Sequence, residues 1–311
     1  MQLKRVTVFG GSGFVGRYIV ERLADQGAGV VVAVRSPEGA KFLRLLGDVG
    51  QIVAVRAPIE DEDAVWAAIR GSDAVVNLVG ILYERGKRTF QSVHVAGARR
   101  VAEAAADTGA RRLVHVSAIG AAPDARSAYA RSKAKGEAAV RLAFPRATIL
   151  RPSIVFGAED KFFNRFAALA RVLPALPLFG GGRTRFQPVW VGDVAAAAVR
   201  ALGDPACEGK TYELGGPRVL DFAALMRMVL AETRRRRVLV PLPFWLGEAQ
   251  GAILGLCPNP PLTRDQVLSL RSDTVVAPGA LTLDDLGITP TALEAVVPKM
   301  LERFRRRTAQ R

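Results

Sequence analysis

The first half of the chain alternates short runs of β-branched residues with longer amphipathic stretches. This alternation is typical of successive βαβ units, in which helices cover both faces of a parallel sheet. The runs predict strands over residues 6–9, 29–34, 51–55, 74–79, 113–117 and 147–150. The stretches between them predict helices over residues 15–26, 37–47, 62–70, 90–107 and 128–143. Asp61 is a candidate N-cap, and Gly27, Gly71 and Gly109 follow predicted helix C-termini.

The second half is less regular and is punctuated by proline and glycine at 179–182 and 258–261. The run 186–191 and the alanine-rich stretch after it predict a return strand and a helix near 187–202 that rejoin the first half. We therefore expect an α/β fold, a Rossmann doubly wound parallel sheet with a smaller, interleaved C-terminal α/β region. The expected division is a Rossmann domain over 1–155 and a smaller region over 156–311, for a substrate pocket or partner docking.

The segment 238–257 is strongly apolar, but Pro241, Pro243, Glu248 and Gln250 interrupt it. A helix that spans a bilayer needs about 20 apolar residues, so we expect no transmembrane helix. Arg234 to Arg237 stand directly before this segment. Such a combination lies at a membrane interface or docks on a partner, or it is a core helix after a solvated charge run. The sequence leaves these alternatives open.

Composition narrows the class of protein. Half of the 311 residues are apolar and 23% are charged, which argues against disorder. Cys207 and Cys257 match no metal-ligand spacing and are too few for a disulfide framework, so we expect no metal and a reducing compartment. The chain runs almost directly into its first strand, so we expect no signal peptide and a bacterial cytoplasmic protein.

The net charge of +15 favours contact with nucleic acid, an acidic protein surface or phospholipid headgroups. A bias of the genome towards arginine explains the surface charge equally well. Because no recognisable module or interleaved aromatic pattern accompanies the charge, we expect no nucleic-acid partner.

A glycine-rich loop at Gly10, Gly13 and Gly16 follows the first strand and opens the first helix, which is the setting of a dinucleotide site. Gly10 permits the tight turn, Gly13 lets the backbone approach a pyrophosphate, and Gly16 allows close helix packing. Gly11 also satisfies the tighter spacing of the motif. The helix N-terminus presents free N–H groups to phosphate, with Ser12, Phe14 and Val15 as further contacts.

Arg35 ends the second strand, where an NAD enzyme places an acidic residue on the ribose 2′-hydroxyl. Arginine instead binds a 2′-phosphate in bidentate fashion, and Ser36 adds a hydrogen bond, so NADPH is the expected cofactor. An exposed arginine without a ligand is the alternative. After the third strand, Ile59 is a candidate adenine wall. Val79 and Gly80 end the fourth strand, where glycine lets the backbone pass close to the cofactor.

Tyr129 and Lys133 form a Y-x-x-x-K pair at helical spacing, with Ser117 upstream at the end of the fifth strand. In the chemistry that this arrangement implies, Lys133 lowers the tyrosine pKa and holds the nicotinamide ribose. Tyr129 exchanges the proton, and Ser117 orients a carbonyl.

These residues resemble the extended and atypical short-chain dehydrogenase/reductase superfamily over essentially the whole chain. Within it, the chain is most similar to the NADPH-binding accessory subunits of respiratory complex I and their alphaproteobacterial relatives. The runs that carry the resemblance are 77–84, 93–100, 113–120, 129–133, 149–157, 162–166 and 186–189.

The resemblance implies tight NADPH binding without known turnover, beside other complex I subunits at the junction of the peripheral and membrane arms. It makes the glycine loop, Arg35, Tyr129 and Lys133 cofactor anchors, and it adds Pro152 and Ile154 as candidate cofactor contacts. His94 stands where extended reductases carry an asparagine of the proton relay, and Ala118 stands where a second hydroxyl is often found. His94 is then either a helix-packing residue or a relay.

Two functions follow as hypotheses. One is a structural and assembly subunit that holds NADPH without turnover, peripheral on the cytoplasmic face of the bacterial inner membrane, with phospholipid headgroup contact through 234–257. The other is an active NADPH-dependent reductase or epimerase on a nucleotide-sugar, steroid-like or quinone-like substrate, for which Ser117, Tyr129 and Lys133 are intact.

Overall fold

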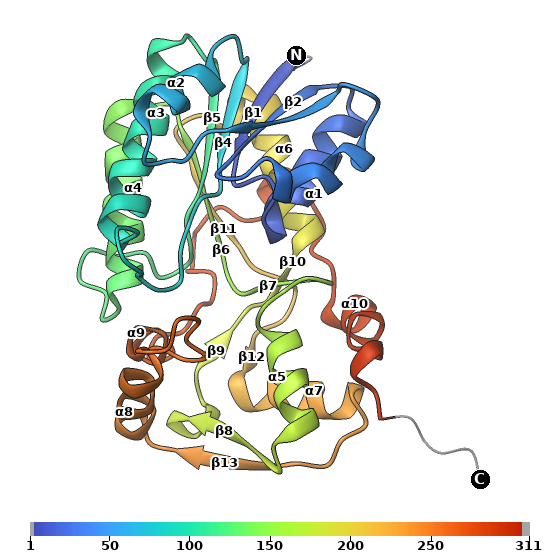
Figure 1. Cartoon of the computed structure of the whole chain (residues 1–311). Helices are drawn as coiled ribbons and strands as arrows, with labels where there is room; N and C mark the ends of the chain where they lie inside the picture. The colour runs from blue at the N-terminus through green and yellow to red at the C-terminus, as the bar shows by residue number, and fades with distance from the viewer. Residues whose placement is uncertain (1–2, 307–311) are drawn as a thin grey trace. The chain divides into compact units, whose positions relative to one another are not determined.

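A seven-stranded parallel sheet forms the centre of the first half, and it contains all six predicted strands (Figure 1). The structure, a computed structural model, describes residues 3–306. The strand order is β11-β6-β5-β4-β1-β2-β3. The strands are β1 (Arg5–Phe9), β2 (Gly29–Val34), β3 (Ile52–Arg56), β4 (Ala74–Asn77), β5 (Arg112–Val116), β6 (Thr148–Pro152) and β11 (Thr211–Leu214). This topology confirms the predicted Rossmann-type α/β fold.

Helices cover both faces of the sheet, as the near-continuous apolar strands require (Figure 1). One face carries α1 (Phe14–Asp25) and α6 (Val191–Gly203). The other carries α2 (Glu62–Ile69), α3 (Ala98–Asp107) and α4 (Ala128–Ala143), whose buried side chains form one core with the sheet. The Asp61 side chain accepts a hydrogen bond from the Ala64 N–H and thus caps α2, as predicted.

Two of the helices predicted in this half are not regular α-helices. Residues Glu38–Leu46 form 3-10 turns (η1), and residues Gln91–Gly97 form a π-helix (η2) that leads into α3. A π-helix is common at functional sites, because its extra residue per turn displaces side chains from regular helical positions.

The predicted return strand at 186–191 is wrong. Pro188 has no backbone N–H, and the run is divided into two short strands, β9 (Arg185–Phe186) and β10 (Val189–Trp190). Neither joins the main sheet: β10 pairs with β7 (Val155–Phe156), and β9 pairs with β12 (Leu220–Asp221). The strand that does return is β11, which lies parallel to β6.

The contacts divide the chain into two units. Unit 1 comprises Met1–Pro152, Val191–Leu214 and Ala277–Thr289, and unit 2 comprises the remaining segments. Unit 2 has its own aromatic and aliphatic core. Its other elements are α5 (Phe163–Val172), β8 (Ala175–Phe179), α7 (Phe222–Glu232), β13 (Val238–Leu242), α8 (Phe244–Leu254), α9 (Arg264–Ser269) and α10 (Leu293–Met300).

Within residues 3–306, no helix has the length and apolar character needed to cross a membrane.

Candidate functional site

The glycine loop connects β1 to α1 at the carboxyl end of the sheet. Gly10 has a φ of 81°, a left-handed conformation that glycine adopts without strain. The Gly13 N–H donates to the Gly10 carbonyl over 3.0 Å, which closes the turn, and Gly13 is the N-cap of α1. No side chain caps this helix, so its first N–H groups face the loop, where phosphate binds in Rossmann folds.

Gly16 is required by close packing. A Cβ atom at Gly16 would lie 2.3 Å from the Gly10 carbonyl oxygen and 2.6 Å from the Gly11 Cα. A Cβ atom at Gly11 would lie 2.7 Å from the Val32 side chain, so this glycine serves packing on β2. The loop therefore has the bare backbone that a pyrophosphate needs.

The strand order reverses between β1 and β4, and ligands of open α/β sheets bind at such a point. Gly10 lies against the backbone of Leu78 and Val79, which directly follow β4. The Asn77 side chain accepts from the Val79 N–H over 3.1 Å and holds this second loop in place. Val79 thus stands beside the glycine loop, whereas a Cβ atom at Gly80 would lie 3.4 Å from His94 Nε2 and 3.5 Å from Lys133 Nζ.

Arg35 lies exposed at the end of β2, and a second arginine lies near it. Arg88 comes from the loop after β4, and its pKa is lowered by burial and by the positive charge of Arg35. Arg88 Nε lies 3.4 Å from Glu60 Oε1, close enough for an ion pair. The same nitrogen is buried and forms no hydrogen bond with any of the described residues. Arg88 thus lies near both a carboxylate and a second positive charge. Sequence reasoning missed Arg88, because no pattern links this loop position to β2.

Ser117, Tyr129 and Lys133 all belong to unit 1. Ser117 directly follows β5 and is buried, while Tyr129 and Lys133 are separated by one turn of α4. Lys133 Nζ donates to the Val116 carbonyl over 3.0 Å. Burial lowers the pKa of Lys133 to about 8 and raises that of Tyr129 to about 12. The tyrosine is therefore held as a neutral phenol.

His94 connects the cofactor side of the site to α4. Its Nε2 accepts from the Ile81 N–H over 2.9 Å, and its Nδ1 contacts Ser132 Oγ at 2.8 Å. Because the Ser132 hydroxyl donates to the Tyr129 carbonyl, the hydrogen bonds assign the ring proton to Nδ1. Burial and the charge of Lys133 lower the pKa of His94 to about 3, so the ring is neutral. Both nitrogens are engaged, which favours helix packing over a relay.

An aromatic cluster fills one side of Tyr129. The His94 ring stacks on Phe90 with a centroid distance of 5.3 Å, and Tyr129 meets both rings edge-on. η2 and α4 approach closely here, since a Cβ atom at Gly136 would lie 2.2 Å from the His94 carbonyl oxygen. Sequence reasoning missed Ser132, although its position one turn after Tyr129 places it on the same face of α4.

Two buried polar atoms in this region lack a partner among the described residues: Ser117 Oγ and His115 Nε2. The Asn77 amide donates to His115 Nδ1 over 3.3 Å, which leaves the Nε2 proton of His115 unpaired. Burial lowers the pKa of His115 to about 3. His115 could have been found from its position two residues before Ser117, on the same face of β5. The glycine cradle and these orphaned atoms fit a bound dinucleotide.

The remaining predicted contacts lie in several places. Ser12, Phe14 and Val15 belong to the glycine loop and the first turn of α1, and Ser36 is exposed beside Arg35. Pro152 ends β6 in unit 1. The Ile59 side chain is buried in the core against Gly97, so it does not line the proposed site. Ile154 belongs to unit 2 and packs on that unit's core.

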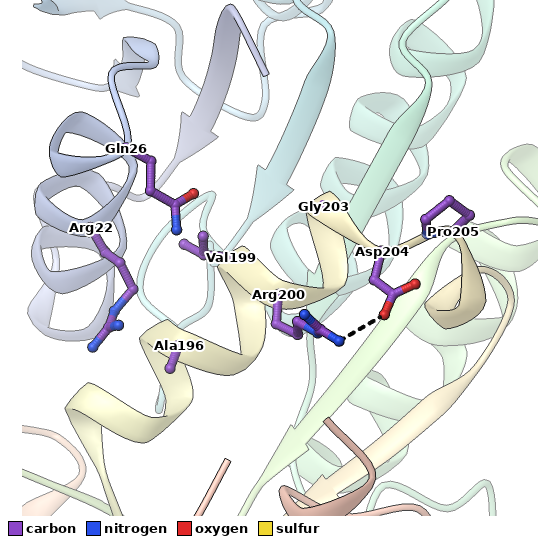
Figure 2. A pocket seen from close by; sticks show the side chains of 8 residues that line it. All are labelled: Arg22, Gln26, Ala196, Val199, Arg200, Gly203, Asp204 and Pro205. Atoms are coloured by element: carbon purple, nitrogen blue, oxygen red, sulfur yellow. Dashed lines mark ion pairs between the residues drawn. The ribbon is translucent and has the colours of Figure 1, made fainter. Parts of the chain in front are cut away.

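A hollow of about 390 Å³ elsewhere in unit 1 contains none of these residues (Figure 2). It lies between the C-terminal half of α1, with Arg22 and Gln26, and α6. Arg200 in its wall already pairs with Asp204 at 3.2 Å. We assign it no role. Among the described residues, no cluster of histidine, cysteine and acidic side chains could hold a metal ion.

Residues 6–215 match the model of the "NAD dependent epimerase/dehydratase family". The chain belongs to this family. The matched segment contains the glycine loop, Arg35, Ser117, Tyr129 and Lys133, and it ends directly after β11. The family's NAD(P)-binding fold thus accounts for the cradle described above.

Curated relatives extend the match over nearly all of the chain. "NADH dehydrogenase [ubiquinone] 1 alpha subcomplex subunit 9, mitochondrial" of Arabidopsis thaliana is 38% identical over 96% of this chain and 78% of its own length. The protein of the same name from Mus musculus is 37% identical over 96% of this chain and 80% of its own length. At this identity and coverage the chain also belongs to the family of these subunits.

Solved structures have the same fold. The NADPH complex of the quinone oxidoreductase QOR2 from Escherichia coli superposes with a TM-score of 0.75. It is 20% identical and covers 96% of this chain and 99% of its own.

Proposed function

We propose that this protein is the NADPH-holding accessory subunit of respiratory complex I, which binds the nucleotide without turning it over. The observation that carries the proposal is the similarity to the subunit 9 relatives over 96% of the chain, through both units. The proposal places the chain among other complex I subunits near the junction of the peripheral and membrane arms. It also makes the chain peripheral on the cytoplasmic face of the bacterial inner membrane, with phospholipid headgroups at 234–257.

The choice of NADPH over NADH is supported by Arg35 and Arg88. Burial and the positive charge of Arg35 lower the pKa of Arg88, and the nearby Glu60 carboxylate acts in the opposite direction. A 2′-phosphate carries the negative charge that would relieve this repulsion, and guanidinium groups bind its oxygens in bidentate fashion. NADH lacks this phosphate and gains nothing from either arginine.

The absence of turnover is supported by the state of Tyr129 and Lys133. A proton donor in a reductase needs a pKa close to the working pH, whereas burial raises the pKa of Tyr129 to about 12. Lys133 donates to the Val116 carbonyl, and His94 has both ring nitrogens engaged. These contacts join α4 to β5 and to the loop after β4, which favours a structural role for the side chains.

Native purification tests the subunit role. Membranes solubilised in mild detergent should yield the chain in a high-mass fraction together with the other complex I subunits. A chain that is recovered as a free protein in every detergent tested would contradict the proposal.

An active reductase or epimerase is the second candidate, because Ser117, Tyr129 and Lys133 are all present and Lys133 contacts the carbonyl of Val116, the residue before Ser117. Steady oxidation of NADPH with a carbonyl, nucleotide-sugar or quinone substrate, abolished in Tyr129→Phe, would establish it. Failure across a broad panel of such substrates, with NADPH demonstrably bound, would reject it.

A further inference from the structure

Helix α8 of unit 2 packs inward through two glycines, while several of its large apolar residues face outward. Cβ atoms at Gly247 and Gly251 would lie 2.6 Å from the Phe179 ring and from the backbone of α9 and its N-cap, so these glycines form the buried face. Glu248 pairs with Arg264 and Arg271 on the side towards α9. The sequence alternative of a core helix is therefore wrong for α8.

The opposite side of α8 is an apolar stripe, which we call the outer face. It is formed at helical spacing by Trp245, Ala249, Ala252, Ile253 and, in the following turn, Leu256. Trp245 is 67% exposed, Ile253 69% and Leu256 87%. An amphipathic helix on a core buries such a face, and exposed apolar stripes of this kind mark interaction sites.

A group of arginines, which we call the arginine cluster, lies at the other end of β13 from α8. Arg235 and Arg237 follow α7, and the Arg237 guanidinium donates to the Ala170 carbonyl over 2.9 Å, which brings it to the end of α5. The pKa of Arg235 is lowered by its burial and by the positive charges of Arg237, Arg171 and Arg306. Among the described residues, no carboxylate forms an ion pair with any of the four. The Arg235 Nε is buried without a partner among them.

Strand β13 joins the arginine cluster to the outer face (Figure 1). Its five residues span about 17 Å at the usual rise of a strand. Val238 at its start is 66% exposed, next to the exposed Val172 at the end of α5. Arg235 and Arg237 of the arginine cluster, β13 and the outer face thus form one continuous stretch of chain, which we call this edge of unit 2, with unpaired positive charge at one end and outward apolar side chains at the other.

We infer that this edge of unit 2 binds the surface of an anionic phospholipid bilayer, with the outer face of α8 inserted at the acyl boundary and the arginine cluster on headgroup phosphates. The inference deepens the proposed peripheral membrane position and rests on it. An anionic bilayer supplies phosphate and hydrocarbon in one plane, and tryptophan favours that boundary. A second copy of the chain would instead bring an identical arginine cluster to this edge. At 11 residues, α8 lies in the plane and does not span.

Vesicle flotation with the full-length chain tests the inference. The chain should float with vesicles of phosphatidylcholine and phosphatidylglycerol, and much less with pure phosphatidylcholine. Arg171→Gln with Arg235→Gln should weaken binding to the anionic vesicles by roughly tenfold or more. Trp245→Gln with Ile253→Gln should also weaken it by roughly tenfold or more. Leu142→Gln and Arg70→Gln, on exposed positions of unit 1, are matched controls and should bind as the parent chain does.

Vesicles with brominated acyl chains report insertion directly. They should quench the fluorescence of Trp245, and the quenching should disappear in Trp245→Phe. Binding that is equal for neutral and anionic vesicles, or the absence of quenching, would overturn the inference. So would α8 variants that fail to join complex I yet bind vesicles normally, because the face would then be a protein interface. A chain that binds vesicles but never comigrates with complex I contradicts the proposed function and leaves this inference standing.

Discussion

The guanidinium of Arg88 lies close enough to Arg35 for the positive charge of one to disfavour that of the other. Arg35 could be predicted from the sequence, because it occupies a fixed position at the end of β2. Arg88 could not, because a loop brings it there and no periodicity constrains a loop. Ser117, Tyr129 and Lys133 are proposed from the sequence for the same reason as Arg35, because a strand end and helical spacing fix their places after β5 and on α4.

Replacement of Arg88 by glutamine should weaken NADPH binding by roughly tenfold and leave NADH binding unchanged, because a charged hydrogen bond to the 2′-phosphate is lost. Titration calorimetry with both nucleotides measures the two dissociation constants. Arg85→Gln, at an exposed position of the same loop, is the control and should change neither constant. An equal loss for NADPH and NADH would show that Arg88 supports the loop and makes no contribution to specificity.

The two histidines of the chain, His94 and His115, should make it sensitive to acid. Their folded-state pKa is lowered to about 3, so between pH 6.5 and about 3 the unfolded chain binds protons that the folded chain does not. The free energy of unfolding is therefore highest above pH 6.5, and each histidine lowers it by up to about 1.4 kcal/mol per pH unit as the pH falls.

Urea unfolding from pH 7 to pH 4.5 measures this slope. The variant His94→Asn should be less stable at pH 7, since two hydrogen bonds are changed, but its stability should fall less steeply with acid. An unchanged slope would mean that folding does not lower the pKa of His94.

At the scale of the elements, β-branched runs located six strands of the sheet, and glycine and Asp61 located helix ends. The π-helix η2 was not predictable, because the close approach of Gly136 to the His94 carbonyl is a tertiary contact. The strand β11 was missed since its four residues carry no clear alternation. The sequence alone left the environment of the segment 238–257 open. Apolar residues are usually buried, but several of those on α8 face outward.

Replacement of Gly16 by alanine should destabilise the chain by about 1–3 kcal/mol and abolish dinucleotide binding, because the added Cβ meets the backbone of the loop that holds the phosphates. Urea unfolding and nucleotide titration measure the two effects. Gly39→Ala is the matched control, since a Cβ atom there has no neighbour within 4 Å and Gly39 has no positive φ. Normal NADPH binding by Gly16→Ala would contradict the assignment of the phosphate site.

At the scale of the whole molecule, unit 1 carries the nucleotide site, and unit 2 carries the arginine cluster and the outer face of α8. A nucleotide that binds the folded chain alone stabilises it by mass action and needs no chemistry to do so. At a hundredfold excess over its dissociation constant, NADPH should add about 2.7 kcal/mol to the free energy of unfolding. Thermal unfolding should show a higher midpoint with NADPH than with equal NADH, whereas equal midpoints would contradict the NADPH preference.

The nucleotide content of respiring complex I tests the central claim most directly. Membranes are allowed to oxidise NADH to a steady state, the complex is purified in mild detergent, and the nucleotide released on denaturation is identified and counted. We expect one NADPH per copy of this chain, still reduced after many turnovers of the complex. Release of NADP⁺ in place of NADPH, of NAD(H), or of no nucleotide at all would contradict an NADPH-holding subunit without turnover.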